Sequence, residues 1–260
     1  MKMMVCGKGG SGKSTVTALM AKEYARQGKR ALVIDCDESN YGLHQQLGLE
    51  LPRDFTDCVG GKQRIMMLSA NGPMNMAPLF DKPCTLDDIP EEYVSEKDGV
   101  MLMSPGKIKD ANEGCACSFN IVVFHFLPML QLRKDEVVIM DMEAGIEHFG
   151  RGTGNSTDAV LMVVDPSYES LKLSEKVSEI CAKVGHPVYY VFNRVTAKNE
   201  ATMIDKINAP EKIICKLPVY DALMEAGLTG APLEGEYPEI RAMLENLGQA
   251  DFFAVVSVKR

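Results

Sequence analysis

The sequence predicts an α/β fold in which a mostly parallel, twisted β-sheet is flanked by helices on both faces. Short apolar runs recur along the chain, as expected for strands that are buried on both faces. Helical patterns separate most of these runs, and such alternation is typical of right-handed crossovers between parallel strands. The apolar runs lie at residues 3–6, 31–34, 100–103, 137–140, 160–164, 188–192 and 212–217. The helical patterns lie at residues 13–27, 120–132, 171–184, 201–208 and 239–247.

Residues 51–99 interrupt this alternation. The stretch is rich in Pro, Gly, Asp and Met and lacks a strong period, so we interpret it as an irregular insertion with room for one short strand pair. With 46% hydrophobic and 25% charged residues in 260 positions, the chain has ample material for a large core. We therefore expect residues 1–260 to form a single domain that the insertion decorates.

The charge and hydropathy of the chain exclude several classes of protein. A formal net charge of −8 and an isoelectric point of about 5.1 argue against nucleic-acid and membrane partners. The chain shows no secretory pattern and no run of the roughly 18 apolar residues that a spanning helix needs, which predicts a cytoplasmic protein. In a reducing compartment the eight cysteines are expected to be ligands or buried residues rather than disulfides. Those expected in the core are Cys6, Cys36, Cys181 and Cys215.

A glycine-rich loop joins the first predicted strand to the first predicted helix. Its sequence GKGGSGKS, residues 7–14, fits the phosphate-loop pattern G-x-x-x-x-G-K-[ST]. Glycines let successive backbone N–H groups surround a phosphate, and the helix N-terminus adds partial positive charge. Lys13 is expected to reach the β- and γ-phosphate oxygens, and the Ser14 hydroxyl to bind Mg²⁺. The predicted ATP-binding residues here are Gly7, Lys8, Gly9, Gly10, Ser11, Gly12, Lys13, Ser14 and Thr15.

Lys8 is an additional cation in this loop. From its position alone it is either a solvated surface lysine or a group that reaches a nucleotide. The order K-G-G-x-G-K-S over residues 8–14 resembles the deviant Walker A motif of the SIMIBI class of nucleotide-driven dimers, which includes the Min and Par ATPases and the nitrogenase iron protein. The resemblance implies a P-loop NTPase fold of SIMIBI type and a homodimer. It also implies that Lys8 crosses to the phosphates of the facing subunit and, with Lys13, acts in catalysis.

Acidic residues follow two of the predicted strands. Asp35 and Asp37 lie at the carboxyl end of one strand, the edge at which ligands bind in open parallel sheets. Alternate residues share a face, so both carboxylates are expected near the phosphates. Asp141 ends another strand in the Walker B form, and Gly145 then frees the backbone for a switch loop. Family resemblance assigns Asp37 as the catalytic residue that positions water, and places Ser14, Asp37 and Asp141 around Mg²⁺.

The adenine pocket is predicted from two later segments. YYVFNRV ends its strand at Asn193, and KLPVYDAL carries a proline loop after the next strand. Both resemble the family's adenine pocket, where the Asn reads the base edge and the proline loop packs on the ring. We interpret the nucleotide as ATP rather than GTP, since the N-K-x-D guanine pattern is absent. The expected pocket residues are Asn193, Arg194, Leu217, Pro218 and Val219.

The segment EGCACSFN, residues 113–120, holds two cysteines one residue apart. Cys115 and Cys117 are either incidental thiols or half of a tetrahedral metal shell. Gly114 allows both sulfurs to point one way, and no nearby His or Cys completes a set of four ligands. A two-fold axis near the pair would bring two pairs together, giving one Zn²⁺ or Ni²⁺ ion per dimer at the interface.

A narrower resemblance is carried by the cysteine pair together with DMEAGIEHFGRGT, residues 141–153. These resemble the CooC-type ATPases, accessory proteins of carbon monoxide dehydrogenase, over about residues 1–238 and most weakly in 51–99. The resemblance implies an ATP-hydrolysing dimeric metallochaperone, using ATP and Mg²⁺, that assists nickel insertion into that client enzyme. Glu38 stands where many relatives have proline, which weakens the assignment of the client.

Three other functions remain open. Related accessory ATPases serve acetyl-CoA synthase or another metalloenzyme. A Min/Par-type partitioning ATPase would need a basic DNA surface or a basic amphipathic C-terminal helix, whereas residues 250–260 carry only two terminal basic charges. An electron donor of the iron-protein type draws its cluster ligands from two widely separated cysteines. Glu147 and His148 fit either a surface relay to a client or an ordinary structural histidine.

Overall fold

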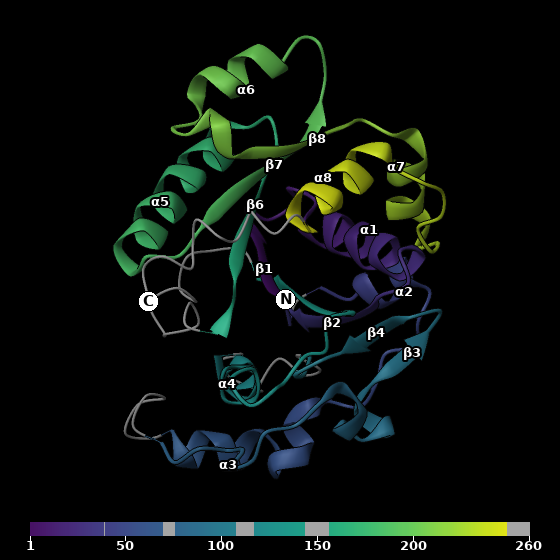
Figure 1. Ribbon diagram of the computed structural model, residues 1–260, viewed down its shortest axis with the longest axis vertical. Coiled ribbons are helices and arrows are strands. Elements are labelled where there is room, and N and C mark those ends of the chain that lie inside the picture. Colours follow the sequence, from purple (N-terminus) through teal and green to yellow (C-terminus); the bar gives the residue numbers. More distant parts are fainter. Residues whose placement is uncertain (39, 70–75, 108–116, 144–155, 249–260) are drawn as a thin grey trace.

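A computed structural model describes residues 1–38, 40–69, 76–107, 117–143 and 156–248 of the chain. The described strands form one eight-stranded sheet in the order β3-β4-β2-β5-β1-β6-β7-β8 (Figure 1). Every neighbouring pair is parallel except β3 and β4. The strands are β1 (Lys2–Gly7), β2 (Arg30–Cys36), β3 (Ser95–Lys97), β4 (Val100–Met103), β5 (Glu136–Met142), β6 (Ala159–Val164), β7 (Val188–Val195) and β8 (Ile213–Pro218). The predicted fold class is confirmed.

Helices cover both faces of the sheet. They are α1 (Lys13–Arg26), α2 (Leu43–Leu47), α3 (Gly61–Leu68), α4 (Cys117–Phe126), α5 (Tyr168–Val184), α6 (Glu200–Lys206), α7 (Asp221–Thr229) and α8 (Pro238–Gly248). Side chains alternate along β1: Met3 and Val5 belong to a core with α1, α2, α7 and α8. Met4 and Cys6 belong to a second core with α4, α5 and α6. The sheet is thus the middle of three layers (Figure 1).

The helix predicted at residues 120–132 is shifted and shorter in the structure. It begins at Cys117 and ends at Phe126. Pro128 accounts for the early end, because the residue before a proline is disfavoured in the helical conformation. The other predicted helices lie within a few residues of their expected bounds.

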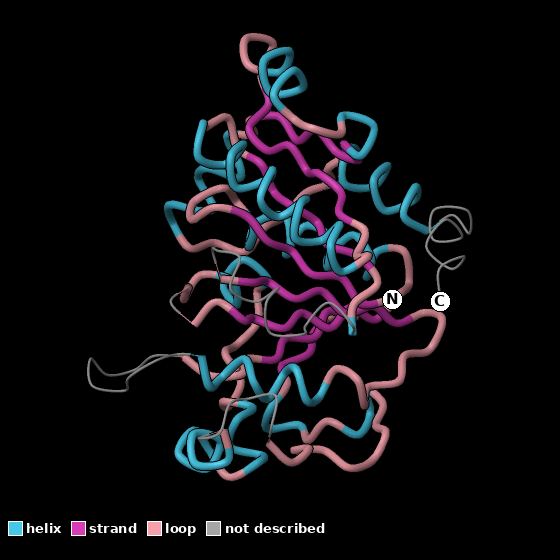
Figure 2. Tube along the Cα trace, turned by 90° about the vertical axis from the view of Figure 1, so that its left-hand side faces the viewer, coloured by secondary structure: helices cyan, strands magenta, loops and turns pink. Residues whose placement is uncertain are grey.

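The described residues between 51 and 94 lie at one end of the long axis, beyond β4 (Figures 1 and 2). The segment 51–99 contains α3, several short 3₁₀ turns and the strand β3, which pairs with β4. The α3 helix was not predicted, because Ile65 is its one buried residue and a single buried position gives no period. The aromatic rings of Phe55, Phe80 and Phe126 stack or meet edge to face, which fastens the insertion to α4.

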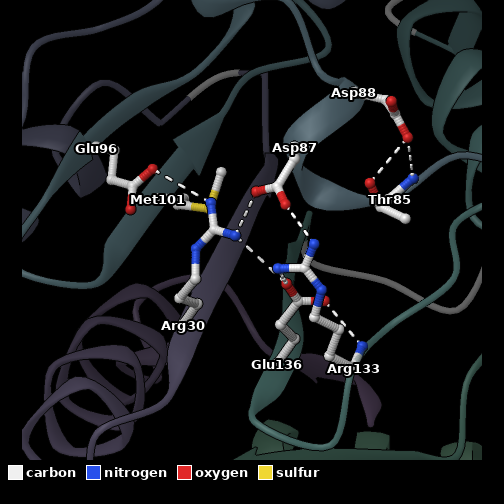
Figure 3. A network of polar contacts seen from close by, with 8 residues as sticks. All are labelled: Arg30, Thr85, Asp87, Asp88, Glu96, Met101, Arg133 and Glu136. Carbon is white, nitrogen blue, oxygen red and sulfur yellow. Dashed lines mark hydrogen bonds and ion pairs between the residues drawn. The ribbon is translucent and has the colours of Figure 1, made fainter.

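An ionic network joins the insertion to the amino edge of the sheet (Figure 3). Arg30, the first residue of β2, lies 2.6 Å from Asp87 of the insertion and 3.4 Å from Glu136, the first residue of β5. Arg133 contacts the same two carboxylates. Because the Glu136 side chain is only 1% exposed, its partners are needed to offset its burial.

No described helix is both long and apolar enough to cross a membrane.

Candidate nucleotide site

The phosphate loop connects β1 to α1 and is shaped by two glycines. Gly12 has a φ of +95°, and a side chain there would overlap the Asn193 amide nitrogen. A β-carbon on Gly7 would lie 2.6 Å from the Val163 carbonyl oxygen. No side chain caps the N-terminus of α1, so the N–H groups of its first turn are available to an anion. The Ser11 hydroxyl is buried without a hydrogen-bond partner among the described residues, as in a cradle built for a polar ligand.

The two lysines of the loop point in different directions. Lys13 is 6% exposed, and its Nζ donates to the Lys8 carbonyl at 3.4 Å, so the ammonium folds over the loop where phosphates would lie. Lys8 Nζ instead donates to Ser167 Oγ at 3.3 Å and lies 3.9 Å from Glu169. The predicted action of Lys8 on a facing subunit stays a prediction.

Ser14 and Asp141 meet at the predicted magnesium site. Ser14 Oγ donates to Asp141 Oδ2 at 2.6 Å, and Asn40 Nδ2 donates to Ser14 Oγ at 2.6 Å. Asp141 is fully buried, and burial, followed by the negative charge of Asp35, raises its pKa to about 7. Hydroxyl and carboxylate oxygens suit Mg²⁺, and a divalent cation would relieve the buried charge of Asp141. The residues present therefore fit a magnesium ion bound by Ser14 and Asp141, and the predicted contribution of Asp37 to this site stays a prediction.

Asp35 and Asp37 have different surroundings, although the sequence predicts that both approach the phosphates. Asp35 Oδ2 accepts a hydrogen bond from Lys107 Nζ at 2.6 Å, and each side chain is 1% exposed. Burial raises the pKa of Asp35 to about 6, against the opposing effect of Lys107. Asp35 is thus half of a buried ion pair, while Asp37, 8% exposed, follows the end of β2.

The sequence reasoning missed Lys107 and Asn40. Lys107 follows β4, and Asn40 lies four residues beyond β2, so both come from the carboxyl edge of the sheet. That edge was a usable signal, because polar residues that follow buried parallel strands gather there. Glu38, marked above as a departure from relatives, is also buried at 6% exposure, and burial raises its pKa to about 7.

A cavity of about 350 Å³ adjoins the first turn of α1. It is lined by Thr15, Asn193, Arg194, Pro218, Val219, Tyr220, Leu223, Met224 and Gly227. Most of the residues predicted for the adenine pocket are therefore brought together, whereas Leu217 is buried in the core beside them and does not line the cavity. Asn193 Nδ2 donates to the Ser11 carbonyl at 2.8 Å, and Arg194 Nη1 donates to the Gly10 carbonyl at 2.9 Å. The cavity wall and the phosphate loop are thus directly connected.

Residues 2–233 match the CobQ/CobB/MinD/ParA nucleotide binding domain. This chain belongs to that family. It is a P-loop NTPase, as the phosphate loop and the Ser14–Asp141 pair predict. The family assignment confirms the coarser of the two resemblances found in the sequence.

Two relatives match this chain over nearly its whole length. It is 43% identical over 248 residues to an uncharacterized ATP-binding protein of Methanocaldococcus jannaschii, covering 95% of this chain and 99% of that one. It is 27% identical over 258 residues to the carbon monoxide dehydrogenase accessory protein CooC of Rhodospirillum rubrum, covering 95% and 98%. The septum site-determining protein MinD of Pyrococcus horikoshii, solved with Mg-ADP, shares the fold with a TM-score of 0.66 at 16% identity, covering 98% of both chains.

Several residues for which the sequence predicts a role lie outside the described part of the chain. They are Gly114, Cys115, Gly145, Glu147, His148 and the tail at 250–260. Cys117 is the first residue of α4, and its side chain is not described. Of the described cysteines, Cys6, Cys36, Cys181 and Cys215 are buried, as predicted.

Proposed function

We propose that this protein is an ATP-hydrolysing, homodimeric maturation factor that assists nickel insertion into the active-site cluster of carbon monoxide dehydrogenase. The observation that carries the proposal is the attachment of α4, which begins at Cys117, to the nucleotide site. Asn120 of α4 donates from Nδ2 to the Cys36 carbonyl at the end of β2, at 3.2 Å. A movement of the segment after β2 would therefore reach the helix that carries half of the cysteine pair.

The site supplies the groups that ATP hydrolysis needs. The amides of the phosphate loop and Lys13 bind the phosphates, and the cavity beside Thr15 holds the base. Ser14 and Asp141 would hold Mg²⁺, which would supply positive charge to the phosphate oxygens. Asp37 orients the attacking water, and Lys8 of the facing subunit stabilises the charge that develops on the transferred group.

The cargo of the proposed cycle is a nickel ion, with zinc as a second occupant. Cys115 and Cys117 of two protomers would give four thiolates, the number in a closed tetrahedral site. One ion per dimer is the expected ratio. Nucleotide-driven changes in the dimer would then alter the geometry of the four sulfurs and control release of the ion to the client.

The metal stoichiometry tests this proposal. Protein purified without oxygen is loaded with Ni²⁺ or Zn²⁺, with and without a nonhydrolysable ATP analogue, and metal per chain is measured beside oligomeric mass. We expect about one ion per two chains, lost in Cys115→Ala/Cys117→Ala and retained in the matched control Cys58→Ala/Cys84→Ala. Equal metal in both double variants would contradict the metal site. Nickel-dependent activation of apo carbon monoxide dehydrogenase, compared with apo acetyl-CoA synthase, tests the client.

A Min/Par-type positioning ATPase is the second candidate. It is favoured by 28% identity over 260 residues to the septum site-determining protein MinD of Helicobacter pylori, covering 92% of this chain and 83% of that one. Such a function requires ATP-dependent capture by a membrane or by DNA. Co-sedimentation with anionic vesicles in the presence of ATP, together with a DNA-binding assay, separates the candidates: capture supports the second, and metal-dependent client activation supports the first.

A further inference from the structure

Lys107 Nζ contacts three acceptors that come from one short segment of the chain. It lies 2.6 Å from Asp35 Oδ2, 2.6 Å from the Asp37 carbonyl oxygen and 2.6 Å from the Asn40 carbonyl oxygen. An ammonium group has three donors, so these contacts use all of them. We infer that Lys107 is a positioning residue for ATP hydrolysis, which holds Asp37 and Asn40 in place at the nucleotide site. The inference rests on the proposed ATPase cycle.

Asp37 and Asn40 need such a support because β2 ends at Cys36. Beyond that residue, the ladder of the sheet no longer supplies partners for the backbone. Lys107 supplies donors to the carbonyls of Asp37 and Asn40. The side chain is 1% exposed, so water does not compete for these contacts.

The support is itself firmly held. The backbone on the amino-terminal side of Lys107 accepts hydrogen bonds from the insertion, with Phe55 N at 2.8 Å from the Ser104 carbonyl and Thr56 N at 3.1 Å from the Pro105 carbonyl. Gly106 packs so closely on the Phe119 ring that a β-carbon would overlap it. The lysine is therefore anchored to the insertion and to α4, and the segment after β2 is held against it.

The supported residues reach the magnesium site directly. Asn40, whose carbonyl Lys107 binds, donates from its side chain to Ser14 Oγ at 2.6 Å. Asp37, whose carbonyl Lys107 also binds, is the residue assigned to orient water. Within the described part of the chain, Lys107 hydrogen-bonds to Asp35, Asp37 and Asn40 and not to the phosphate loop. Loss of Lys107 is therefore expected to misplace Asp37 and Asn40 while the loop that binds the phosphates stays intact.

A change at Lys107 is expected to affect both stability and the proposed positioning, and a second substitution separates the two effects. A buried ion pair is often replaceable by neutral groups without loss of stability, whereas removing one partner leaves the other charge buried and unpaired. Lys107→Met is therefore expected to lower both the melting temperature and kcat. Adding Asp35→Asn removes the unpaired charge and keeps a side-chain oxygen for the hydrogen bond from the Asp37 backbone to residue 35. In that double variant the Asp37 and Asn40 carbonyls still lack the Lys107 ammonium, and the Asp37 carbonyl keeps the hydrogen bond from Asn40 N at 3.2 Å.

The experiment compares the parent, Lys107→Met and Lys107→Met/Asp35→Asn in steady-state ATPase kinetics, ADP binding and thermal unfolding. We expect kcat to fall by about 10- to 100-fold in both variants, as for a small displacement of a catalytic group. The ADP dissociation constant should change by less than about threefold, because no phosphate contact is lost. The melting temperature should recover in the double variant while kcat stays low.

Recovery of kcat together with the melting temperature in the double variant would overturn the inference and leave Lys107 a purely structural residue. Parental kcat in Lys107→Met would do the same. If Lys107→Met does not fold, Lys107→Gln, which keeps a donor without the charge, takes its place and should show the same fall in kcat. A parent that does not hydrolyse ATP would contradict the proposed function itself, whereas an active parent with equally active variants would contradict only the role of Lys107.

Discussion

Asp35 and Asp141 lie opposite each other in the register of β2 and β5, so two buried carboxyl groups are neighbours at the carboxyl edge of the sheet. Lys107 pairs with Asp35, while Asp141 accepts a hydrogen bond from Ser14. The pKa of Asp141 is raised to about 7, first by burial and then by the charge of Asp35. In the absence of a cation, Asp141 therefore tends to hold a proton near neutral pH.

This raised pKa predicts a pH-dependent effect of magnesium. Below about pH 4 both folded and unfolded chains hold the Asp141 proton, and the stability that this group contributes is lost as the pH rises through about 7. Mg²⁺ replaces the proton, so it should restore more stability at high pH. We expect Mg²⁺ to increase the melting temperature of the ADP complex more at pH 8 than at pH 6.

The matched control for this measurement is Asp141→Asn, which keeps the shape of the side chain but does not titrate. The difference between the magnesium increments at the two pH values should shrink in this variant, since the remainder reflects the nucleotide alone. Equal magnesium increments at pH 6 and pH 8 in the parent protein would contradict the assignment of Asp141 as a magnesium ligand.

Lys13 and Asp37 should give opposite phenotypes. Lys13→Ala removes the buried ammonium that lies over the loop, so tight binding of ATP and ADP should be abolished. Asp37→Ala should still bind ATP but turn it over about 100-fold more slowly, because only the orientation of water is lost. Equilibrium nucleotide binding and single-turnover hydrolysis separate the two, with the exposed Asp205→Ala as a control. An Asp37→Ala variant that hydrolyses at the parental rate would refute its catalytic role.

Gly12→Ala should weaken nucleotide binding through Asn193. The positive φ at Gly12 costs an alanine about 1–3 kcal/mol, and its β-carbon would also displace the Asn193 amide from the Ser11 carbonyl. Gly28 has a similar φ of +77° with nothing within 4 Å of a β-carbon, so Gly28→Ala carries the strain alone. We expect ADP affinity, measured by calorimetry, to fall by more than about tenfold in Gly12→Ala only. A comparable fall in Gly28→Ala would mean that strain explains the loss.

Two carboxylates of the ionic network at the amino edge of the sheet, Glu136 and Asp87, should contribute unequally to the free energy of unfolding. Glu136 is buried and accepts from the Arg133 backbone N–H at 2.8 Å as well as from Arg30. Glu136→Gln should therefore lower the free energy of unfolding by about 2 kcal/mol. Asp87, 48% exposed in the same network, is screened by water, so Asp87→Asn should have a much smaller effect. Denaturant titration of both variants checks the ranking, and equal losses would show that burial does not decide it.

The sheet and the phosphate loop could be predicted because local sequence determines them. Strands buried on both faces show as continuous apolar runs, and the spacing of glycines and Lys13 determines the loop within eight residues. Three short helices could not be predicted in this way, and one of them is α3, which buries only Ile65. The α2 helix has five residues and α7 buries only Ala226, so none of the three shows an apolar period long enough to detect.

The contacts within the site were predicted less completely. Residues that follow parallel strands gather at the carboxyl edge of the sheet, and this principle placed Asp35, Asp37 and Asp141 together. It did not identify the residues that they contact. The Asp35–Lys107 pair joins residues 72 positions apart, and such a contact follows from the order of strands in the sheet. A single sequence contains no signal for that order.

The pairing of β1 has a consequence for how the protein becomes active during its synthesis. Its neighbours are β5 and β6, and in the register Val5 lies opposite Asp141 while Met3 lies opposite Ala159. The strand that leads into the phosphate loop therefore leaves the ribosome long before either neighbour exists. At ordinary rates of translation the delay is about ten seconds or more. The nascent chain completes its nucleotide site only after β7 delivers Asn193 to the loop and the lining residues between 218 and 227 close the cavity beside it. The complete site therefore does not exist while the amino-terminal half is being made.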